Sequence, residues 1–132
     1  MFTLLLGHLT GDYLLQNSWM ALNKTKNTFN GWMAALVHCL IYTAAVCLFM
    51  WNFDMIWIGV VFLSHFPIDK FGLGDKYMHY LKGGGLKDYV YENDNPVTRL
   101  TTLEGGFKAF VYAMTDNTMH LILMWGAYQL IY

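Results

Sequence analysis

The chain has 132 residues, enough for one domain; 56% of them are hydrophobic, 17% aromatic and only 13% charged. Soluble globular domains are about half apolar and about a quarter charged, so this composition favours a membrane protein. The formal net charge of -1 provides no basic surplus, which excludes nucleic acid as an expected partner because its phosphates attract basic surfaces.

The hydrophobic residues form four runs, each long enough to cross a bilayer, which requires about 17 to 25 residues. Because the first two connections are short, neighbouring runs are expected to lie antiparallel. The predicted fold class is therefore all-α: a polytopic membrane protein with a four-transmembrane-helix bundle in a single transmembrane domain, residues 1–132. The predicted helices are Phe2–Leu22, Trp32–Trp51, Asp54–Phe71 and Gly106–Tyr132. Asp54 is expected to cap the third of them.

The third connection, residues 72–105, is predicted to be a cytoplasmic loop with some structure of its own. Its segment DKYMHYLK, residues 75–82, is amphipathic and predicts a short interfacial helix. The triplet Gly83–Gly85 is not accompanied by the Lys and Ser or Thr of a phosphate-binding loop, so we interpret it as a hinge.

All eight basic residues fall on one side of this topology. By the positive-inside rule, the first and third connections are then cytoplasmic and both termini lie outside. The basic residues are Lys24 and Lys26 in the first connection, and Lys70, Lys76, Lys82, Lys87, Arg99 and Lys108 in or beside the third.

Apart from the expected cap Asp54, seven histidines and aspartates lie inside the predicted helices: His8, Asp12, His38, His65, Asp69, Asp116 and His120. Such groups cost several kcal/mol in hydrocarbon unless they are paired or solvated, so they indicate a functional site. All except His38 form His/Asp pairs spaced i, i+4, which places both members of a pair on one helix face.

Imidazole and carboxylate groups together are ligands of zinc, manganese and iron, and helix bundles build such sites from facing helices. We therefore predict that all seven residues form a divalent-metal site, with zinc as the first expectation and manganese or iron as alternatives. Because seven exceed the four ligands of a closed zinc site, either two metals bind or some carboxylates orient the histidines. At about 1.5 Å per helical residue, His38 and His65 lie at one depth and Asp12 about 6 Å deeper.

Further roles follow from the same residue types and from their polar neighbours. A carboxylate that is not needed as a ligand can act as a general base, and the candidate catalytic residues are Asp12, Asp69 and Asp116. Amides hydrogen-bond substrate or water, and lysines attract phosphate. The candidate substrate-binding residues are Gln16, Asn117, Lys24 and Lys70.

In these motifs the chain resembles a family of small bacterial and phage membrane proteins, domain of unknown function 3307. The matching features are HLTGDYLLQ at residues 8–16 with Trp19 and Lys24, the lone His38 before Ile41 and Tyr42, HFPIDK at 65–70 and DNTMH at 116–120. The family often has glutamine where this chain has Asn117. The resemblance implies a location in the bacterial inner membrane, and a looser similarity to inner-membrane metal-dependent hydrolases implies hydrolysis.

Two functions compete on these residues. The first is a metal-dependent hydrolase acting on a lipid or another phosphate-bearing amphiphile; the second is a transporter or channel subunit with a proton or divalent-cation path. A purely structural hydrogen-bond network is less expected, because Asn, Ser and Thr hold helices together at a lower desolvation cost. The expected partners are membrane lipids and further copies of the chain, since four helices shield a polar centre poorly.

Overall fold

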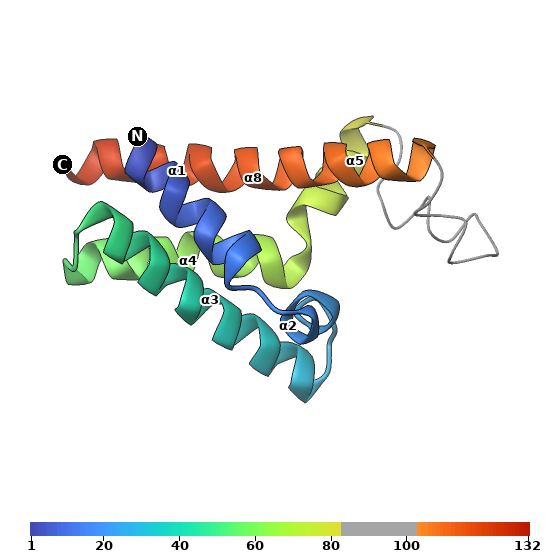
Figure 1. Ribbon diagram of the computed structural model, residues 1–132, viewed down its shortest axis with the longest axis horizontal. Helices are drawn as coiled ribbons and strands as arrows, with labels where there is room; N and C mark the ends of the chain where they lie inside the picture. The colour runs from blue at the N-terminus through green and yellow to red at the C-terminus, as the bar shows by residue number, and fades with distance from the viewer. Residues whose placement is uncertain (83–102) are drawn as a thin grey trace. The chain divides into compact units, whose positions relative to one another are not determined.

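The computed structural model describes residues 1–82 and 103–132, and all regular structure in these two ranges is helical (Figure 1). The predicted all-α class is thereby confirmed. The described helices are α1 (Phe2–Leu9), the π-helical turn η1 (Thr10–Leu14), α2 (Ser18–Asn23), α3 (Phe29–Met50), α4 (Met55–Phe71), α5 (Leu73–Lys82) and α8 (Leu103–Ile131). The predicted hinge Gly83–Gly85 and the basic residues Lys87 and Arg99 lie outside the described residues.

Short polar side chains begin several of these helices. Asn17 caps α2 and Thr28 caps α3, each by accepting a hydrogen bond from a backbone N–H three residues further on. Asp54 Oδ1 accepts hydrogen bonds from the N–H groups of Ile56 and Trp57, at 2.8 and 3.3 Å. The predicted cap of the third helix is confirmed, since these N–H groups have no partner inside the helix.

The first predicted helix, Phe2–Leu22, is not continuous. Helix α1 ends at Leu9, η1 adds one wide turn, and residues 15–17 are non-helical before α2 begins. The physical reason is the second start signal at Asn17, whose extended backbone and side-chain cap begin a new helix. With 8 and 5 residues, α1 and η1 together span about 20 Å, less than the hydrocarbon core of a bilayer.

The other predicted helices agree with the structure within a few residues. The run Trp32–Trp51 corresponds to α3, which begins earlier because Thr28 is its cap. The run Asp54–Phe71 corresponds to α4, and the run Gly106–Tyr132 to α8. The short helix predicted within the third connection is α5.

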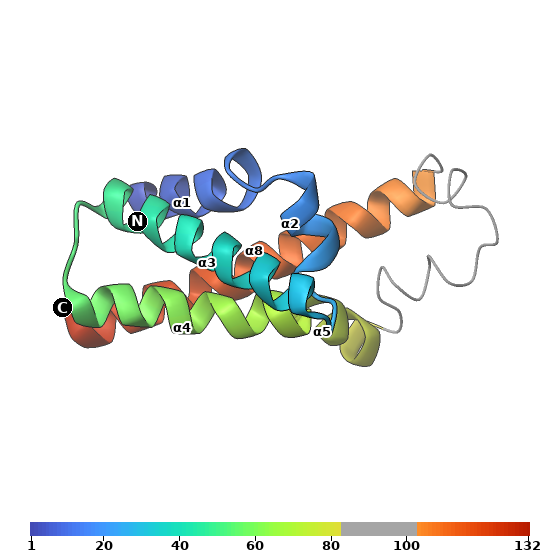
Figure 2. The ribbon, with the colours of Figure 1, turned by 90° about the horizontal axis from the view of Figure 1, so that it is seen from below.

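The described chain forms two compact units. The first comprises Met1–Phe71 and His120–Tyr132, and the second runs from Gly72 to Met119. In the first unit α3 and α4 are antiparallel and joined by a short turn (Figure 2). The core of the first unit consists of Leu4, Tyr42, Val46, Cys47, Trp57, Val61 and Met124. The single transmembrane domain stays a prediction.

Two glycines allow the first segment to approach α3 closely. A Cβ at Gly7 would lie 2.9 Å from Cα of Val46, and one at Gly11 would lie 2.7 Å from Cδ2 of Tyr42. Their spacing of four residues is the small-xxx-small pattern through which helix backbones meet in membrane proteins. This contact brings Asp12, the neighbour of Gly11, against α3.

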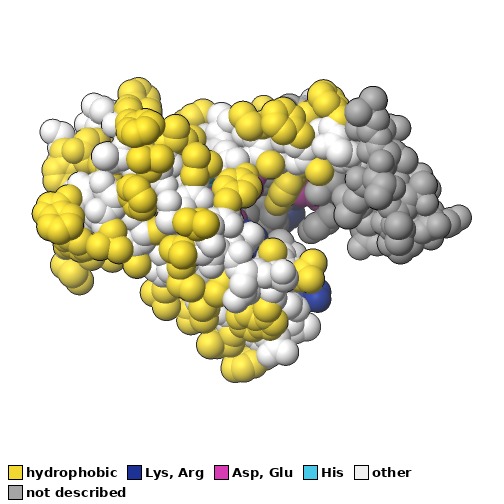
Figure 3. All heavy atoms as spheres, viewed as in Figure 1, with side chains coloured by type: hydrophobic (Ala, Val, Ile, Leu, Met, Phe, Trp, Pro, Cys, Tyr) yellow, Lys and Arg dark blue, Asp and Glu magenta, His cyan; other side chains and the backbone are white. Residues whose placement is uncertain are grey.

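Large hydrophobic side chains are exposed on α1, α3, α4 and α8, and they cover much of the face over α1 and α3 in Figure 3. Extended apolar surface of this kind contacts lipid or other proteins. Among the described helices, α3, with a mean hydropathy of 2.1, is the one that is long and apolar enough by itself to cross a membrane. Helix α4 and Leu73–Leu81 would form a second span only if the two helices, which are bent at a break between them, crossed together. One such helix also occurs in soluble cores, so it is weak support for membrane association and does not confirm four spans.

Candidate metal centre

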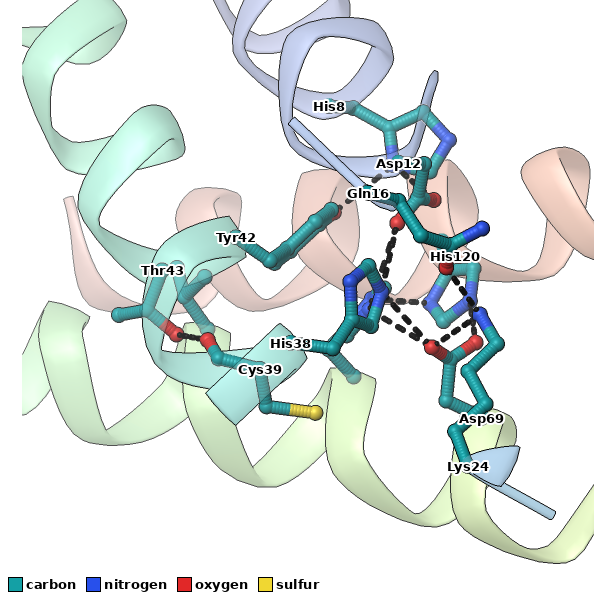
Figure 4. Close-up of polar contacts among 12 residues, drawn as sticks. His8, Asp12, Gln16, Lys24, His38, Cys39, Tyr42, Thr43, Asp69 and His120 are labelled. Carbon is teal, nitrogen blue, oxygen red and sulfur yellow. Dashed lines mark hydrogen bonds and ion pairs between the residues drawn. The ribbon is translucent and has the colours of Figure 1, made fainter. Parts of the chain in front are cut away.

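Two histidines and two aspartates from three elements meet in the interior of the first unit (Figure 4). Asp12 lies on η1, His38 on α3, and His65 and Asp69 on successive turns of α4. The side chains of the two histidines and Asp69 are at most 2% exposed, and that of Asp12 is 10% exposed. Because buried polar groups are costly unless they are paired, this cluster requires partners for its nitrogen and oxygen atoms.

The atoms that face one another in the cluster are separated by similar distances. His38 Nε2 lies 3.1 Å from His65 Nε2, 3.3 Å from Asp12 Oδ1 and 2.9 Å from Asp69 Oδ2. His65 Nε2 lies 3.4 Å from Asp12 Oδ1 and 3.3 Å from Asp69 Oδ2. Two nitrogens and two oxygens thus surround a common centre.

These separations fit a divalent metal ion. An ion about 2.0 to 2.1 Å from four tetrahedral ligands holds them about 3.3 to 3.4 Å apart, and neighbouring ligands of an octahedral ion lie about 3.0 Å apart. Imidazole nitrogen and carboxylate oxygen suit zinc, manganese and iron. Asp12 Oδ1 is also buried and accepts no hydrogen bond within the described residues, so its lone pairs are available to a cation.

His120 extends the cluster on the side of α8. Its Nδ1 lies 3.1 Å from His65 Nδ1, and its Nε2 lies 3.5 Å from Asp69 Oδ1. If His65 binds a cation through Nε2, its ring proton is on Nδ1, which points to Nδ1 of His120. The ring proton of His120 is then on Nε2, which faces Asp69 Oδ1. His120 is therefore placed to fix the orientation of His65 and Asp69, and its own role as a ligand stays a prediction.

Tyr42 and His8 support the ligands from another side. The Tyr42 ring stacks on His65, with centroids 3.5 Å apart and an interplanar angle of 11°. The Tyr42 hydroxyl is hydrogen-bonded to His8 Nδ1 at 2.8 Å, and this nitrogen lies 3.4 Å from Asp12 Oδ2. His8 thus contacts the Asp12 oxygen that does not face the other ligands. Sequence reasoning missed the role of Tyr42, although the residue lies one helical turn after His38 and belongs to the motif that carries the family resemblance.

Lys24 reaches the cluster from the end of α2. Its Nζ lies 2.6 Å from Asp69 Oδ2 and 2.7 Å from Gln16 Oε1. The Lys24 side chain is 14% exposed, so it lies with Asp12 on the side of the cluster nearest to solvent. Two predicted substrate-binding residues are thus beside the candidate ligands.

Lys70, the third predicted substrate-binding residue, does not face the cluster. Its ammonium donates hydrogen bonds to the backbone carbonyls of Lys26 at 2.7 Å and Lys24 at 3.2 Å, and it lies 4.3 Å from the centroid of the Trp32 ring. The side chain is buried. Because its donors are used inside the protein, Lys70 holds the connection that carries Lys24, and this arrangement does not favour substrate binding.

Of the remaining predicted site residues, Asp116 and Asn117 belong to the second unit. There the Asp116 carboxylate lies against Gly74 of α5, where a Cβ would come within 2.7 Å of Oδ1. Their part in the site stays a prediction. The depth difference between Asp12 and the two histidines stays a prediction; their side chains meet, since Asp12 Oδ1 lies within 3.4 Å of both Nε2 atoms.

The residues of this cluster lie in the motifs that carry the family resemblance, from HLTGDYLLQ in the first segment to HFPIDK in α4. The model of the family described as Protein of unknown function (DUF3307) matches residues 1–132. The chain belongs to the DUF3307 family. No curated protein and no solved structure matches it, and nothing supports the looser similarity to metal-dependent hydrolases. The function of this DUF3307 chain must therefore be argued from the cluster.

Two substitutions of Tyr42 should separate its two contacts. Tyr42→Phe keeps the ring on His65 and loses the two buried hydrogen bonds of the hydroxyl, with His8 Nδ1 and with Met124 Sδ, so we expect a stability loss of about 1 to 2 kcal/mol with metal content retained. Tyr42→Ala removes the stacked ring, so metal affinity should fall about 10- to 100-fold, as for other outer partners of metal ligands. Thermal unfolding and metal titration check both, and equal metal affinities in the two variants would contradict the stacking role.

Proposed function

We propose that this chain is a membrane-embedded, metal-dependent hydrolase acting on a lipid or another phosphate-bearing amphiphile. One observation carries the proposal: the Nε2 atoms of His38 and His65 lie 2.9 to 3.4 Å from each other and from oxygens of Asp12 and Asp69. Lone pairs of four such groups repel one another around a common centre unless a cation or protons lie between them. A divalent ion in this position would neutralise the two carboxylates and accept lone pairs of His38, His65 and Asp69.

The membrane location is supported by the apolar surface and by the distribution of basic residues. We place residues 2–22, α3, α4 and α8 across a bacterial inner membrane as a multi-pass protein with both termini outside, because the basic residues then face the cytoplasm. The break after η1 is compatible with a bilayer where protein covers it. Further copies of the chain would shield the polar centre, which makes a homo-oligomer part of the proposal.

The cluster divides naturally into ligands and a base. His38, His65 and Asp69 are the most deeply buried members and lie 2.9 to 3.3 Å apart, which suits a site with three protein ligands and open positions. A bound divalent ion supplies Lewis-acid chemistry, since it polarises a phosphoryl oxygen and acidifies water. Asp12 lies at the more exposed edge, where its carboxylate can take a proton from the attacking water.

An amphiphilic substrate is supported by the surroundings of the cluster. Lys24 and Gln16 present an ammonium and an amide beside Asp69 and at the more exposed side, suited to phosphate oxygens. An open groove of about 670 Å³ between α3 and α4 has an almost wholly apolar lining, including Leu40 and Leu63. Leu40 and Leu63 lie two positions from His38 and His65 and are exposed on the other face of each helix, so the groove offers a hydrocarbon chain a place on the outer surface of the two helices that carry these histidines.

The division between ligands and base predicts the behaviour of Asp12→Asn. Metal content should stay within about tenfold of wild type, whereas hydrolysis of a phosphate-bearing lipid should fall about 100- to 10,000-fold, the usual contribution of a general base. Purified protein in lipid nanodiscs, loaded with zinc or manganese, would be assayed for phosphate release or lipid cleavage. Loss of the metal together with activity would make Asp12 a ligand instead.

The same preparation distinguishes the second candidate function, a transporter or channel subunit. This alternative is favoured by the row His38, His65 and His120, whose facing ring nitrogens are each 3.1 Å apart and could pass a proton along hydrogen bonds. Proton or divalent-cation flux into proteoliposomes, lost in His120→Ala and accompanied by no hydrolysis, would support transport and contradict the hydrolase.

A further inference from the structure

The Lys24 ammonium occupies the same carboxylate oxygen that faces the two histidines. Its Nζ lies 2.6 Å from Asp69 Oδ2, and this oxygen is 2.9 Å from His38 Nε2 and 3.3 Å from His65 Nε2. A partner on the other carboxylate oxygen would leave Oδ2 to the metal ion, whereas this ammonium lies on the oxygen that faces both histidines. Here the other oxygen, Oδ1, faces His120 at 3.5 Å.

The charges of the cluster lead to the same conclusion. Asp12 and Asp69 carry two negative charges, which one divalent ion neutralises completely. With the Lys24 ammonium on Asp69 as well, a buried site would hold one positive charge in excess. Cations a few ångströms apart repel strongly where water is scarce, so the ammonium and the metal ion oppose each other at this oxygen.

Lys24 also has a second partner that does not belong to the cluster. Its Nζ lies 2.7 Å from Gln16 Oε1, and its side chain is 14% exposed where that of Asp69 is 2% exposed. A lysine ammonium sits on a flexible four-carbon stem. It can therefore leave Asp69 toward Gln16 and solvent while the backbone stays in place.

We propose that Lys24 is an internal competitor of the metal ion: the ammonium and a divalent cation are alternative partners of Asp69 Oδ2, and metal binding displaces the ammonium. The inference rests on the metal centre of the proposed function and adds an exchange of cations to it. The displaced ammonium, still beside the centre, then becomes available to the phosphate group of a substrate. Lys24 thereby links metal loading to anion binding.

The test compares zinc and manganese affinities of the detergent-purified wild type, Lys24→Met and Lys26→Met by competition with a chromogenic chelator. Lys26 is a matched control, because it is a lysine of the same connection whose Nζ is hydrogen-bonded to Asn23 at 3.0 Å. We expect Lys24→Met to bind metal on the order of tenfold more tightly than wild type and Lys26→Met to be unchanged. If Lys24 only supported Asp69, Lys24→Met would bind about 10- to 100-fold more weakly, which overturns the inference.

A second variant separates the effect of the positive charge from that of the hydrogen bond and provides an alternative if Lys24→Met does not fold. Lys24→Gln keeps a hydrogen-bond donor without the positive charge, so it should also bind metal more tightly, and thermal unfolding with and without metal reports whether each variant is folded. Metal binding by the wild type with equal or weaker binding in both variants overturns the competitor role alone. Failure of the folded wild type and Lys26→Met to bind either ion overturns the proposed function, and the competitor role with it.

Discussion

Asp69→Asn is expected to leave the protein folded and without its metal ion. Asp69 contacts both histidines of the cluster and two residues beside it: Oδ2 faces His38, His65 and Lys24, and Oδ1 faces His120. Asparagine keeps the volume but loses the negative charge and presents an amide to the cation. Affinity should fall more than about 100-fold, since removing an outer partner of a ligand already costs about 10- to 100-fold.

The measurement is elemental analysis of detergent-purified protein after incubation with zinc, manganese or iron, followed by removal of unbound ions. Asp54→Asn is the matched control, because Asp54 is exposed and caps α4, and asparagine caps helices about as well as aspartate. Wild type and Asp54→Asn should retain a stoichiometric ion that Asp69→Asn lacks. Equal metal content in all three proteins would refute the centre.

Alanine at Gly7 is expected to destabilise the protein by pushing α1 away from α3. The added Cβ would lie 2.9 Å from Cα of Val46 and 3.2 Å from Cβ of Phe49. Because a backbone atom cannot rotate away, α1 must move off α3, and overpacking of this kind costs about 1 to 3 kcal/mol. The same movement displaces Asp12, the proposed general base, so hydrolysis should fall as well.

Gly126→Ala provides the matched comparison for this substitution. Gly126 lies inside α8, and a Cβ there meets nothing within 4 Å. Alanine is favoured over glycine in a helix by up to about 1 kcal/mol, so this variant should unfold at the same or a higher temperature than wild type with normal metal affinity. Equal thermal stability of Gly7→Ala and Gly126→Ala would show that α1 does not depend on close contact with α3.

The sequence by itself determined which elements form and which residues carry the chemistry. Hydrophobic runs bounded by polar residues located α3, α4 and α8 within a few residues, because burial and helix caps act locally. It also identified all four members of the inner cluster, since ionisable groups in apolar runs are costly and therefore conspicuous. The continuous first helix was wrong, because the apolar content of the run hides the new start at Asn17.

Only the tertiary structure decided which of those residues face the common centre and which contact them from outside. Spacing along a helix could not separate the inner members Asp12 and Asp69 from His8, which turns to Tyr42 and the outer oxygen of Asp12. It could not show that Lys24 sits on a ligand oxygen while Lys70 is held by backbone carbonyls. The physical reason is that a ligand's role depends on which atoms of different helices meet within about 3.5 Å, and helix periodicity fixes faces but not those contacts.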